Sequence, residues 1–148
     1  MKYSKLMRER IQRVSVIFKE LGYAFAEISK DDQSFTATFK SRSHAFGECL
    51  IDADNKFLEI AYSFSFQSSF SGFIQTRLPE IMRTCYEYGC YINIQYDSEI
   101  SISVFSKIYF AGLNYYALKE TLRDFNGCVG SLEEIFELKK ERNGDEDS

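Results

Sequence analysis

The sequence predicts an α+β fold with a single antiparallel sheet and helices packed on one face, in the order α-β-β-β-β-α-β-β-α(α). Two observations predict it. Several segments alternate apolar and polar side chains with a period of two, which is typical of strands that bury one face. Other segments repeat apolar side chains at spacings of three and four, which is typical of amphipathic helices.

The first helix is predicted over residues 5–21, and Gly22 follows it in a position suited to a left-handed cap. Its apolar stripe consists of Met7, Ile11, Val14, Phe18 and Leu21. The basic side chains around this stripe are interpreted as the solvated face of the helix. They are Lys2, Lys5, Arg8, Arg10, Arg13 and Lys19.

Four strands are predicted next, over residues 23–28, 34–40, 44–51 and 56–66, with polar turns at 30–33 and 52–55. The last of these strands is the longest, and its period of two is unbroken. One of its faces carries Leu58, Ile60, Tyr62, Phe64 and Phe66.

A Ser/Gly loop at 67–72 precedes a second helix, which begins at Gln75 or Pro79 and ends at Tyr88. Pro79 fits the first turn, where a missing N–H has no cost. The buried stripe is Leu78, Ile81, Met82, Cys85 and Tyr88. A hairpin follows, with strands at 91–96 and 99–108 joined by Asp97-Ser98.

The C-terminal region is predicted to be helical from Asn114, which is a good N-cap. Gly127 is expected to break or kink this helix, and a capping box at residues 131–134 is expected to start another segment. One α+β domain is therefore predicted over residues 1–141, followed by a charged, flexible tail over 142–148. The predicted core comprises Phe18, Phe35, Phe39, Ile60, Phe64, Met82, Ile92, Ile94, Ile102 and Val104.

Composition excludes some classes of protein. The chain has 148 residues, of which 45% are hydrophobic, so disorder is not expected. A net charge of -4 disfavours non-specific binding to nucleic acid or to an anionic membrane surface. The first residues lack the apolar region of a signal peptide, and no apolar run approaches about 18 residues. The four cysteines are therefore expected to be free, mostly buried thiols in a cytoplasmic protein.

The sequence contains no recognisable catalytic or metal-binding motif. His44 is the only histidine, and no Cys, Asp or Glu lies at a telling spacing from it. Asp52 and Asp54 have the spacing that opens a calcium loop, but Lys56 and Phe57 stand where a ligand and a glycine are needed. We therefore expect no cofactor, no metal and no enzymatic activity.

The remaining signal is a set of aromatic side chains at positions predicted to be on the surface. They form a candidate protein-binding or dimer surface, although scattered single aromatics are the alternative. These residues are Phe57, Phe70, Phe73, Tyr91 and Phe105.

The order of elements resembles the YbjN-like family of bacterial sensory-transduction regulators, which share a fold with type III secretion chaperones. The resemblance covers residues 8–136. It is carried by Leu21-Gly22-Tyr23, the strands at 35–39 and 58–66, the helix at 79–88, the hairpin at 92–104 and the helices from Asn114. It implies a non-enzymatic module that dimerises or binds a partner polypeptide.

The predicted function is a protein-interaction or chaperone-like regulatory module of the bacterial cytoplasm. The alternative is a small-molecule-binding protein or small enzyme with a sheet-lined pocket near Glu48, Cys49 or Tyr62. A homodimer is expected, through either the outer face of the hairpin or the apolar C-terminal helices. The apolar side chains of those helices are Cys128, Val129, Leu132, Ile135, Phe136 and Leu138.

Overall fold

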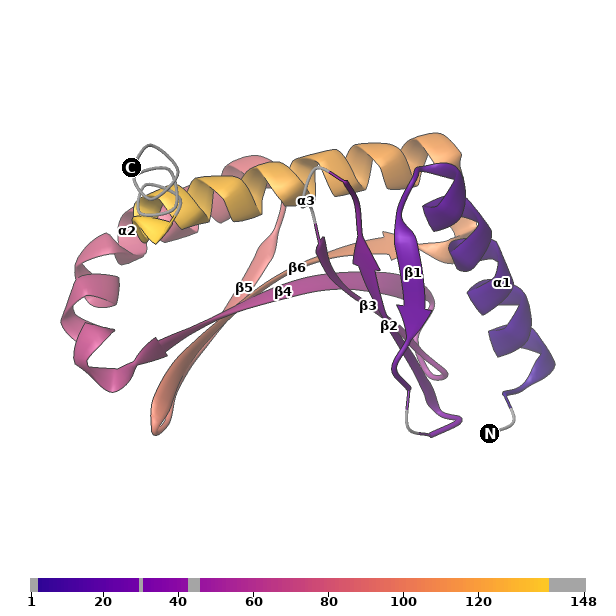
Figure 1. Cartoon of the computed structure of the whole chain (residues 1–148), viewed down its shortest axis with the longest axis horizontal. Helices are drawn as coiled ribbons and strands as arrows, with labels where there is room; N and C mark the ends of the chain where they lie inside the picture. The colour runs from indigo at the N-terminus through magenta and orange to yellow at the C-terminus, as the bar shows by residue number, and fades with distance from the viewer. Residues whose placement is uncertain (1–2, 30, 43–45, 139–148) are drawn as a thin grey trace. The chain divides into compact units, whose positions relative to one another are not determined.

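Six strands form one antiparallel sheet in the computed structural model, which describes residues 3–29, 31–42 and 46–138. The strand order across the sheet is β1-β2-β3-β4-β6-β5 (Figure 1). The predicted α+β class is confirmed. Along the described chain the elements are α1 (Lys5–Glu20), β1 (Ala24–Glu27), β2 (Ser34–Lys40), β3 (Phe46–Asp52), β4 (Phe57–Gln67), the 3-10 helix η1 (Ser68–Phe70), α2 (Ser71–Tyr88), β5 (Tyr91–Tyr96), β6 (Glu99–Tyr109), the 3-10 helix η2 (Phe110–Gly112) and α3 (Tyr115–Ile135).

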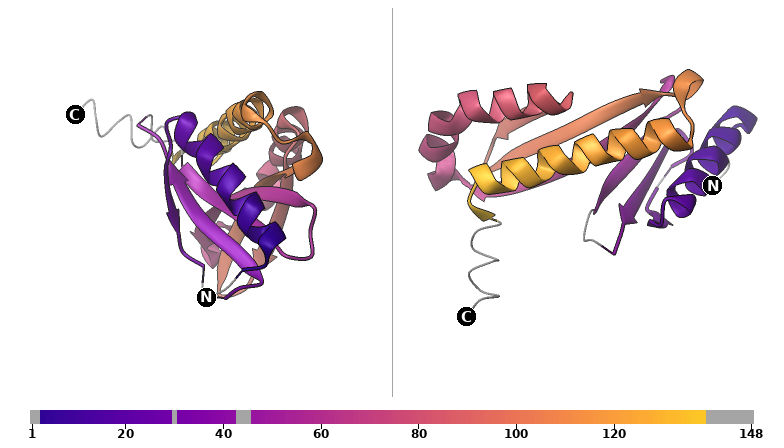
Figure 2. Two further views of the ribbon diagram at one scale, coloured as in Figure 1. Left: turned by 90° about the vertical axis from the view of Figure 1, so that its right-hand side faces the viewer. Right: turned by 90° about the horizontal axis from the view of Figure 1, so that it is seen from above.

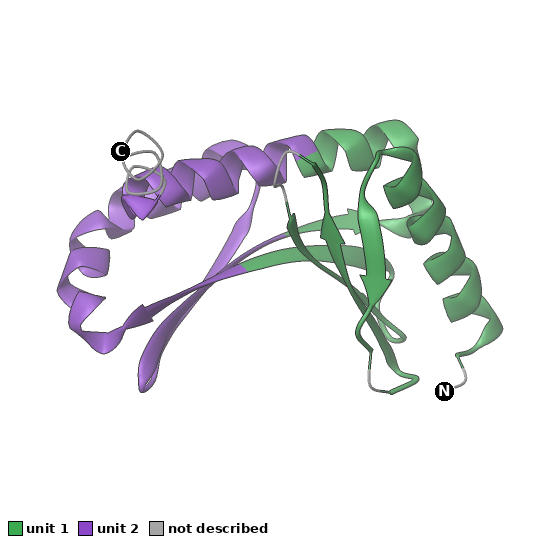
Figure 3. Ribbon diagram, in the orientation of Figure 1, with its two compact units in different colours: residues 1–62, 106–122 green, residues 63–105, 123–148 purple. Residues whose placement is uncertain are grey.

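The chain divides into two units (Figure 3). Unit 1 comprises Met1–Tyr62 and Ser106–Leu122, and unit 2 comprises Ser63–Phe105 and Arg123–Ser148. The single domain predicted over residues 1–141 stays a prediction, and the predicted tail at 142–148 lies outside the described residues.

In unit 1, α1 packs on the side of β2 that carries alternate apolar residues (Figure 2). Phe35, Ala37 and Phe39 are buried, and the Phe39 ring centroid lies 4.9 Å from that of Phe18 on α1. Ser4 caps the helix by accepting a hydrogen bond from the Met7 amide. Gly22 follows the helix with φ +90°, as the sequence predicted.

Two arginines of α1 are not simply solvated, which corrects the sequence-based interpretation. Arg10 donates to the carbonyl of Asn55 at 3.0 Å, and its guanidinium lies 4.5 Å from the Phe110 ring centroid. Arg13 donates to the carbonyls of Phe110 and Leu113 at the ends of η2. These carbonyls are far from α1 in sequence, so helical periodicity alone does not reveal the contacts.

In unit 2, α2 and the C-terminal half of α3 lie on one side of the hairpin β5–β6 (Figure 1). Ile102 and Val104 of β6 are fully buried, as predicted. The helices contribute Ile74, Ile81, Cys85, Phe125, Cys128 and Leu132 to this core, and Phe136 in the turn after α3 is also buried.

Seven of the predicted core residues are buried, and three are not. Met82 is 49% exposed, because the buried stripe of α2 runs through Ile74, Ile81 and Cys85 and turns Met82 away. Ile92 and Ile94 are only half-buried, although they share the face of Val104 and Ile102, their direct partners on β6. The seven buried residues are Phe18, Phe35, Phe39, Ile60, Phe64, Ile102 and Val104.

The second helix begins earlier than predicted. It starts at Ser71, directly after η1, so Pro79 lies inside the helix and not in its first turn. An internal proline costs about 3 kcal/mol, since one N–H is lost and the ring crowds the preceding turn. Ile74 and Ile81 are fully buried on either side of Pro79, which is itself exposed, and this burial offsets the cost.

The third helix is continuous, so two predictions about the C-terminal region are wrong. Asn114 caps it as predicted, accepting from the Ala117 amide at 2.8 Å. Gly127 does not break it, and the capping-box sequence at 131–134 starts no new helix. Gly127 has a packing role instead, because a Cβ atom there would lie 2.7 Å from the Tyr88 ring.

Two glycines of α3 offer a matched test of this contact. Gly127→Ala is expected to lower the free energy of unfolding by about 1 to 3 kcal/mol, because the added methyl group overlaps the Tyr88 ring. Gly130→Ala in the same helix meets no atom within 4 Å and is expected to be neutral or to stabilise by up to about 1 kcal/mol. Denaturant unfolding measures both, and equal stability of the two variants would contradict the contact.

Candidate functional site

The hairpin β5–β6 presents an outward face that belongs to neither the core nor the helices. The strand register pairs Tyr91 with Phe105, Asn93 with Ser103, and Gln95 with Ser101. These six residues, called the hairpin face below, alternate with the inward-facing isoleucines and valine. The helices of unit 2 lie on the opposite side of the hairpin (Figures 1 and 2).

Tyr91 and Phe105 form the aromatic part of the hairpin face. Their ring centroids are 5.5 Å apart with an interplanar angle of 19°, so the rings are stacked. Tyr91 is 53% exposed. Such a pair contributes about 0.5 to 1.5 kcal/mol beyond its buried area. Because one ring of the pair remains open to solvent, it also offers an apolar platform to a ligand.

The rest of the hairpin face is neutral and polar. The Ser103 hydroxyl lies 2.9 Å from the Ser63 hydroxyl, which ties β6 to β4 within unit 2. Asn93 and Gln95 are exposed and carry both hydrogen-bond donors and acceptors. The face holds no carboxylate, thiol, imidazole or amine. Its polar side chains can form hydrogen bonds, and its two rings can stack on a ligand.

The other aromatic residues of the predicted surface lie elsewhere. Phe70 in η1 is 47% exposed, and Phe73 at the start of α2 lies 5.1 Å from the Arg77 guanidinium. Phe57 belongs to unit 1, where its ring lies 5.7 Å from that of Tyr109 and 4.6 Å from the Lys107 ammonium. Of the five residues, only Tyr91 and Phe105 stack on each other.

Glu48, Cys49 and Tyr62 were the predicted lining of a rival pocket. Glu48 is exposed and Cys49 is fully buried, since neighbouring residues of β3 point to opposite faces of the sheet. Burial raises the pKa of the Cys49 thiol to about 12, so this thiol is protonated and unreactive at neutral pH. Tyr62 packs at 5.0 Å against Phe46. A carboxylate–thiol pair is therefore not formed by Glu48 and Cys49.

Three cysteines of unit 2 meet, which the sequence did not reveal. Cys128 on α3 is hydrogen-bonded through its side chain to Cys85 at the end of α2 and to Cys90 just before β5. The hydrogen bond between Cys85 and Cys128 holds the pKa of Cys85 below its usual value and raises that of Cys128. Cys85 and Cys128 are buried, and Cys90 is half-buried. The free, mostly buried thiols predicted from the sequence are confirmed.

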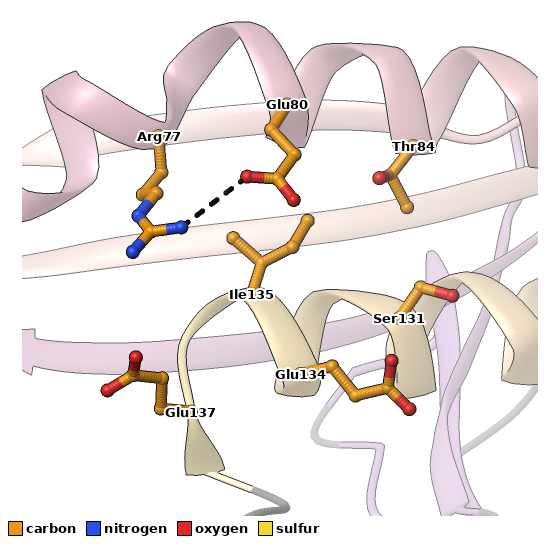
Figure 4. A pocket seen from close by; sticks show the side chains of 7 residues that line it. All are labelled: Arg77, Glu80, Thr84, Ser131, Glu134, Ile135 and Glu137. Atoms are coloured by element: carbon orange, nitrogen blue, oxygen red, sulfur yellow. Dashed lines mark ion pairs between the residues drawn. The ribbon is translucent and has the colours of Figure 1, made fainter.

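A hollow of about 270 Å³ lies between α2 and the end of α3 in unit 2 (Figure 4). Arg77 and Glu80 form an ion pair at 3.7 Å on the α2 side, and Glu134 and Glu137 lie on the other. Ile135 projects between the two sides. Arg77 and Glu80 are substantially exposed, so this arrangement is a solvated rim and not a desolvated reaction site.

Asp52 and Asp54, which have the spacing that opens a calcium loop, form a turn and not a metal site. The Asp52 carboxylate accepts a hydrogen bond from the Asp54 amide at 2.9 Å, which makes a turn as predicted. In the part of the chain that the structure describes, no group of three His, Cys, Asp or Glu side chains is arranged to hold a metal ion. His44 lies outside the described residues. Among the described helices, none is long and apolar enough to cross a membrane.

The thiols are expected to differ sharply in reactivity. Iodoacetamide should modify Cys90 first in the folded protein, because it alone of the four is partly accessible. Cys49 and Cys128 should be modified only after unfolding in urea, which serves as the control for intrinsic reactivity. Mass spectrometry of peptides from a labelling time course measures this order. Labelling of Cys49 as fast as Cys90 in the folded protein would contradict the described burial.

Comparison with known proteins shows the fold alone. No family model matches the chain, and no curated protein matches it. A similar solved structure is that of an uncharacterized protein from Methanothermobacter thermautotrophicus, with a TM-score of 0.67 and 16% sequence identity. The match covers 85% of this chain and 96% of the archaeal chain. The α+β arrangement is thus shared with a known protein across nearly its whole length.

Proposed function

We propose that this chain is a non-catalytic protein-interaction module of the bacterial cytoplasm, and that the hairpin face binds a partner polypeptide. The observation that carries the proposal is the stacked, half-open pair of Tyr91 and Phe105 beside exposed amide side chains. Aromatic side chains of this kind provide large contact area at low entropic cost, and they are enriched at the centres of protein interfaces.

The remainder of the hairpin face defines the chemistry of the partner. Asn93 and Gln95 can each donate to and accept from a peptide backbone. None of the six side chains of the hairpin face carries a carboxylate, ammonium or guanidinium group, so the face does not select for a charged partner. An extended segment with an apolar or aromatic side chain, placed over the Tyr91–Phe105 pair, fits these features.

A relationship to the YbjN-like family, and through it to type III secretion chaperones, is part of the proposal. The order of elements on which that resemblance rests, α-β-β-β-β-α-β-β-α, is the order found along the described chain. The resemblance implies a regulatory, non-enzymatic module, which agrees with a binding surface of neutral side chains. The proposal does not depend on a shared ligand or on shared residues.

Selection from a phage-displayed peptide library tests the proposed surface. Peptides enriched on the wild-type protein are expected to contain aromatic or large apolar residues. The double variant Tyr91→Ser/Phe105→Ser should bind them at least about tenfold more weakly, which corresponds to about 1.4 kcal/mol. Tyr86→Ser is the matched control, because Tyr86 is 86% exposed on α2 and outside the hairpin face.

Circular dichroism of each variant checks that the fold is retained. Binding that is unaffected by the double variant, or equally weakened by Tyr86→Ser, would place the interaction elsewhere. A library that yields no enriched peptide at all would count against a peptide-binding hairpin face.

A further inference from the structure

The edge strand β5 lacks the charges, prolines and bulges that usually protect a sheet edge. It is the last strand of the sheet, with β6 as its neighbour. Its sequence, Tyr-Ile-Asn-Ile-Gln-Tyr, contains no charge and no proline, and the uncharged stretch extends back to Tyr88. Natural proteins normally place charges, prolines or bulges at such an edge, because an unprotected edge pairs with another strand.

The opposite edge of the sheet provides an internal comparison. β1 has only four residues and ends in a charged one, Glu27. The Glu27 carboxylate also accepts a hydrogen bond from the Tyr3 hydroxyl at 2.7 Å. A short strand with a charge at its end is a poor template for pairing. The two edges of the same sheet therefore differ in the way expected if only β5 is used for association.

Burial on the inward face of β5 points the same way. Ile92 and Ile94 are half-buried, whereas Val104 and Ile102, their direct partners on β6, are fully buried. Two isoleucines on the core side of a sheet are normally covered by a neighbouring strand or by helices. The helices of unit 2 leave both of them partly open, so the core is incomplete at this edge.

We propose that β5 pairs with β5 of a second copy of this chain, antiparallel and across a two-fold axis at Asn93. In this register Asn93 faces the second copy's Asn93, and Ile92 faces the second copy's Ile94. Tyr91 then lies opposite the second copy's Gln95, on the outward side. Each contact is repeated by symmetry, as an isologous interface requires. The sheet becomes continuous through both copies.

The near-palindromic sequence of β5 favours this occupant and this register. Directly opposed residues of an antiparallel pair lie on the same face of the sheet. If the two-fold axis passes through a residue, the isoleucines of both copies lie on the same, inward face. If it passes between two residues, they lie on opposite faces. An axis at Ile94 would place Asp97 opposite Tyr91. An axis at Asn93 keeps every pair from residue 90 to residue 96 uncharged. A second copy thus supplies the missing apolar neighbours of Ile92 and Ile94 without introducing a buried charge.

This pairing rests on the strand edge and not on the proposed peptide-binding function. It has a consequence for that function, however. The hairpin faces of the two copies would lie on the same side of one continuous sheet, with Tyr91 of each copy near the shared axis. In this proposal the interface of the predicted homodimer lies at the free edge of β5. At the alternative location, the apolar C-terminal segment, Cys128, Leu132, Ile135 and Phe136 are buried within the single chain, whereas Val129 and Leu138 are half-buried.

Sedimentation of the full chain between about 1 and 100 µM tests the pairing. The wild-type protein is expected to form a dimer in this range. Asn93→Lys should weaken self-association at least about tenfold, because it places two ammonium groups opposite each other at the axis. Ser101→Lys is the control, since it adds the same charge to the same face of the hairpin but on β6. A wild-type monomer throughout, or a dimer that Asn93→Lys leaves intact, would overturn the proposal.

Cysteine cross-linking fixes the register independently of any loss of folding. Asn93→Cys places two thiols opposite each other and should give a covalent dimer on mild oxidation. Gln95→Cys lies opposite Tyr91 and should cross-link much less, and the wild-type protein corrects for the native Cys90. Cross-linking of Gln95→Cys in preference to Asn93→Cys would overturn the Asn93-centred pair. Failure of peptide binding with an intact cross-link would affect only the proposed function.

Discussion

The rest of the structure depends on the one-sided burial of its sheet. Strands with a period of two place aromatic and branched side chains on one face, and only that face needs helices to cover it. Within unit 1 the covered face carries Phe35 and Phe39 under α1. Within unit 2 the covered face carries Ile102 and Val104 under α2 and α3. The other face is more exposed and carries both polar side chains, such as Glu48, and apolar ones, such as Phe46. The aromatic pair of the hairpin face lies on that side of β5 and β6.

The same constraint explains where the helices need specific contacts. A helix that covers only one face of a sheet is positioned by its own ends and by its neighbours. Tyr88, the last residue of α2, lies against Gly127 of α3, and this close approach is possible because Gly127 has no side chain. In unit 1, Arg10 and Arg13 bind backbone carbonyls and so tie α1 to η2 and to the turn before β4. These are positioning contacts, and none of them brings reactive groups together.

Local signals made much of the fold predictable. All six strands were predicted, and the alternation in the hairpin correctly placed Ile92 and Ile94 on the same face as Ile102 and Val104. The Asn114 cap was predictable for the same reason, since it depends on neighbours in sequence. Features that depend on distant contacts were missed. The sequence alone suggested that Gly127 breaks the helix, whereas its role depends on the distant Tyr88 ring. Cys85, Cys90 and Cys128 have no motif spacing, and tertiary packing brings them together. The sequence predicted Tyr91 and Phe105 as separate surface residues. The strand register, which pairs them directly, brings them together as one stacked pair.

An edge completed by a second copy is tested most directly by amide hydrogen exchange at two protein concentrations. Exchange in β5 is expected to slow as concentration rises, because outward backbone amides become hydrogen-bonded to the second copy. β1, the protected edge, should exchange at the same rate at both concentrations. Exchange in β5 that is independent of concentration, or that slows equally in β1, would contradict the pairing of β5.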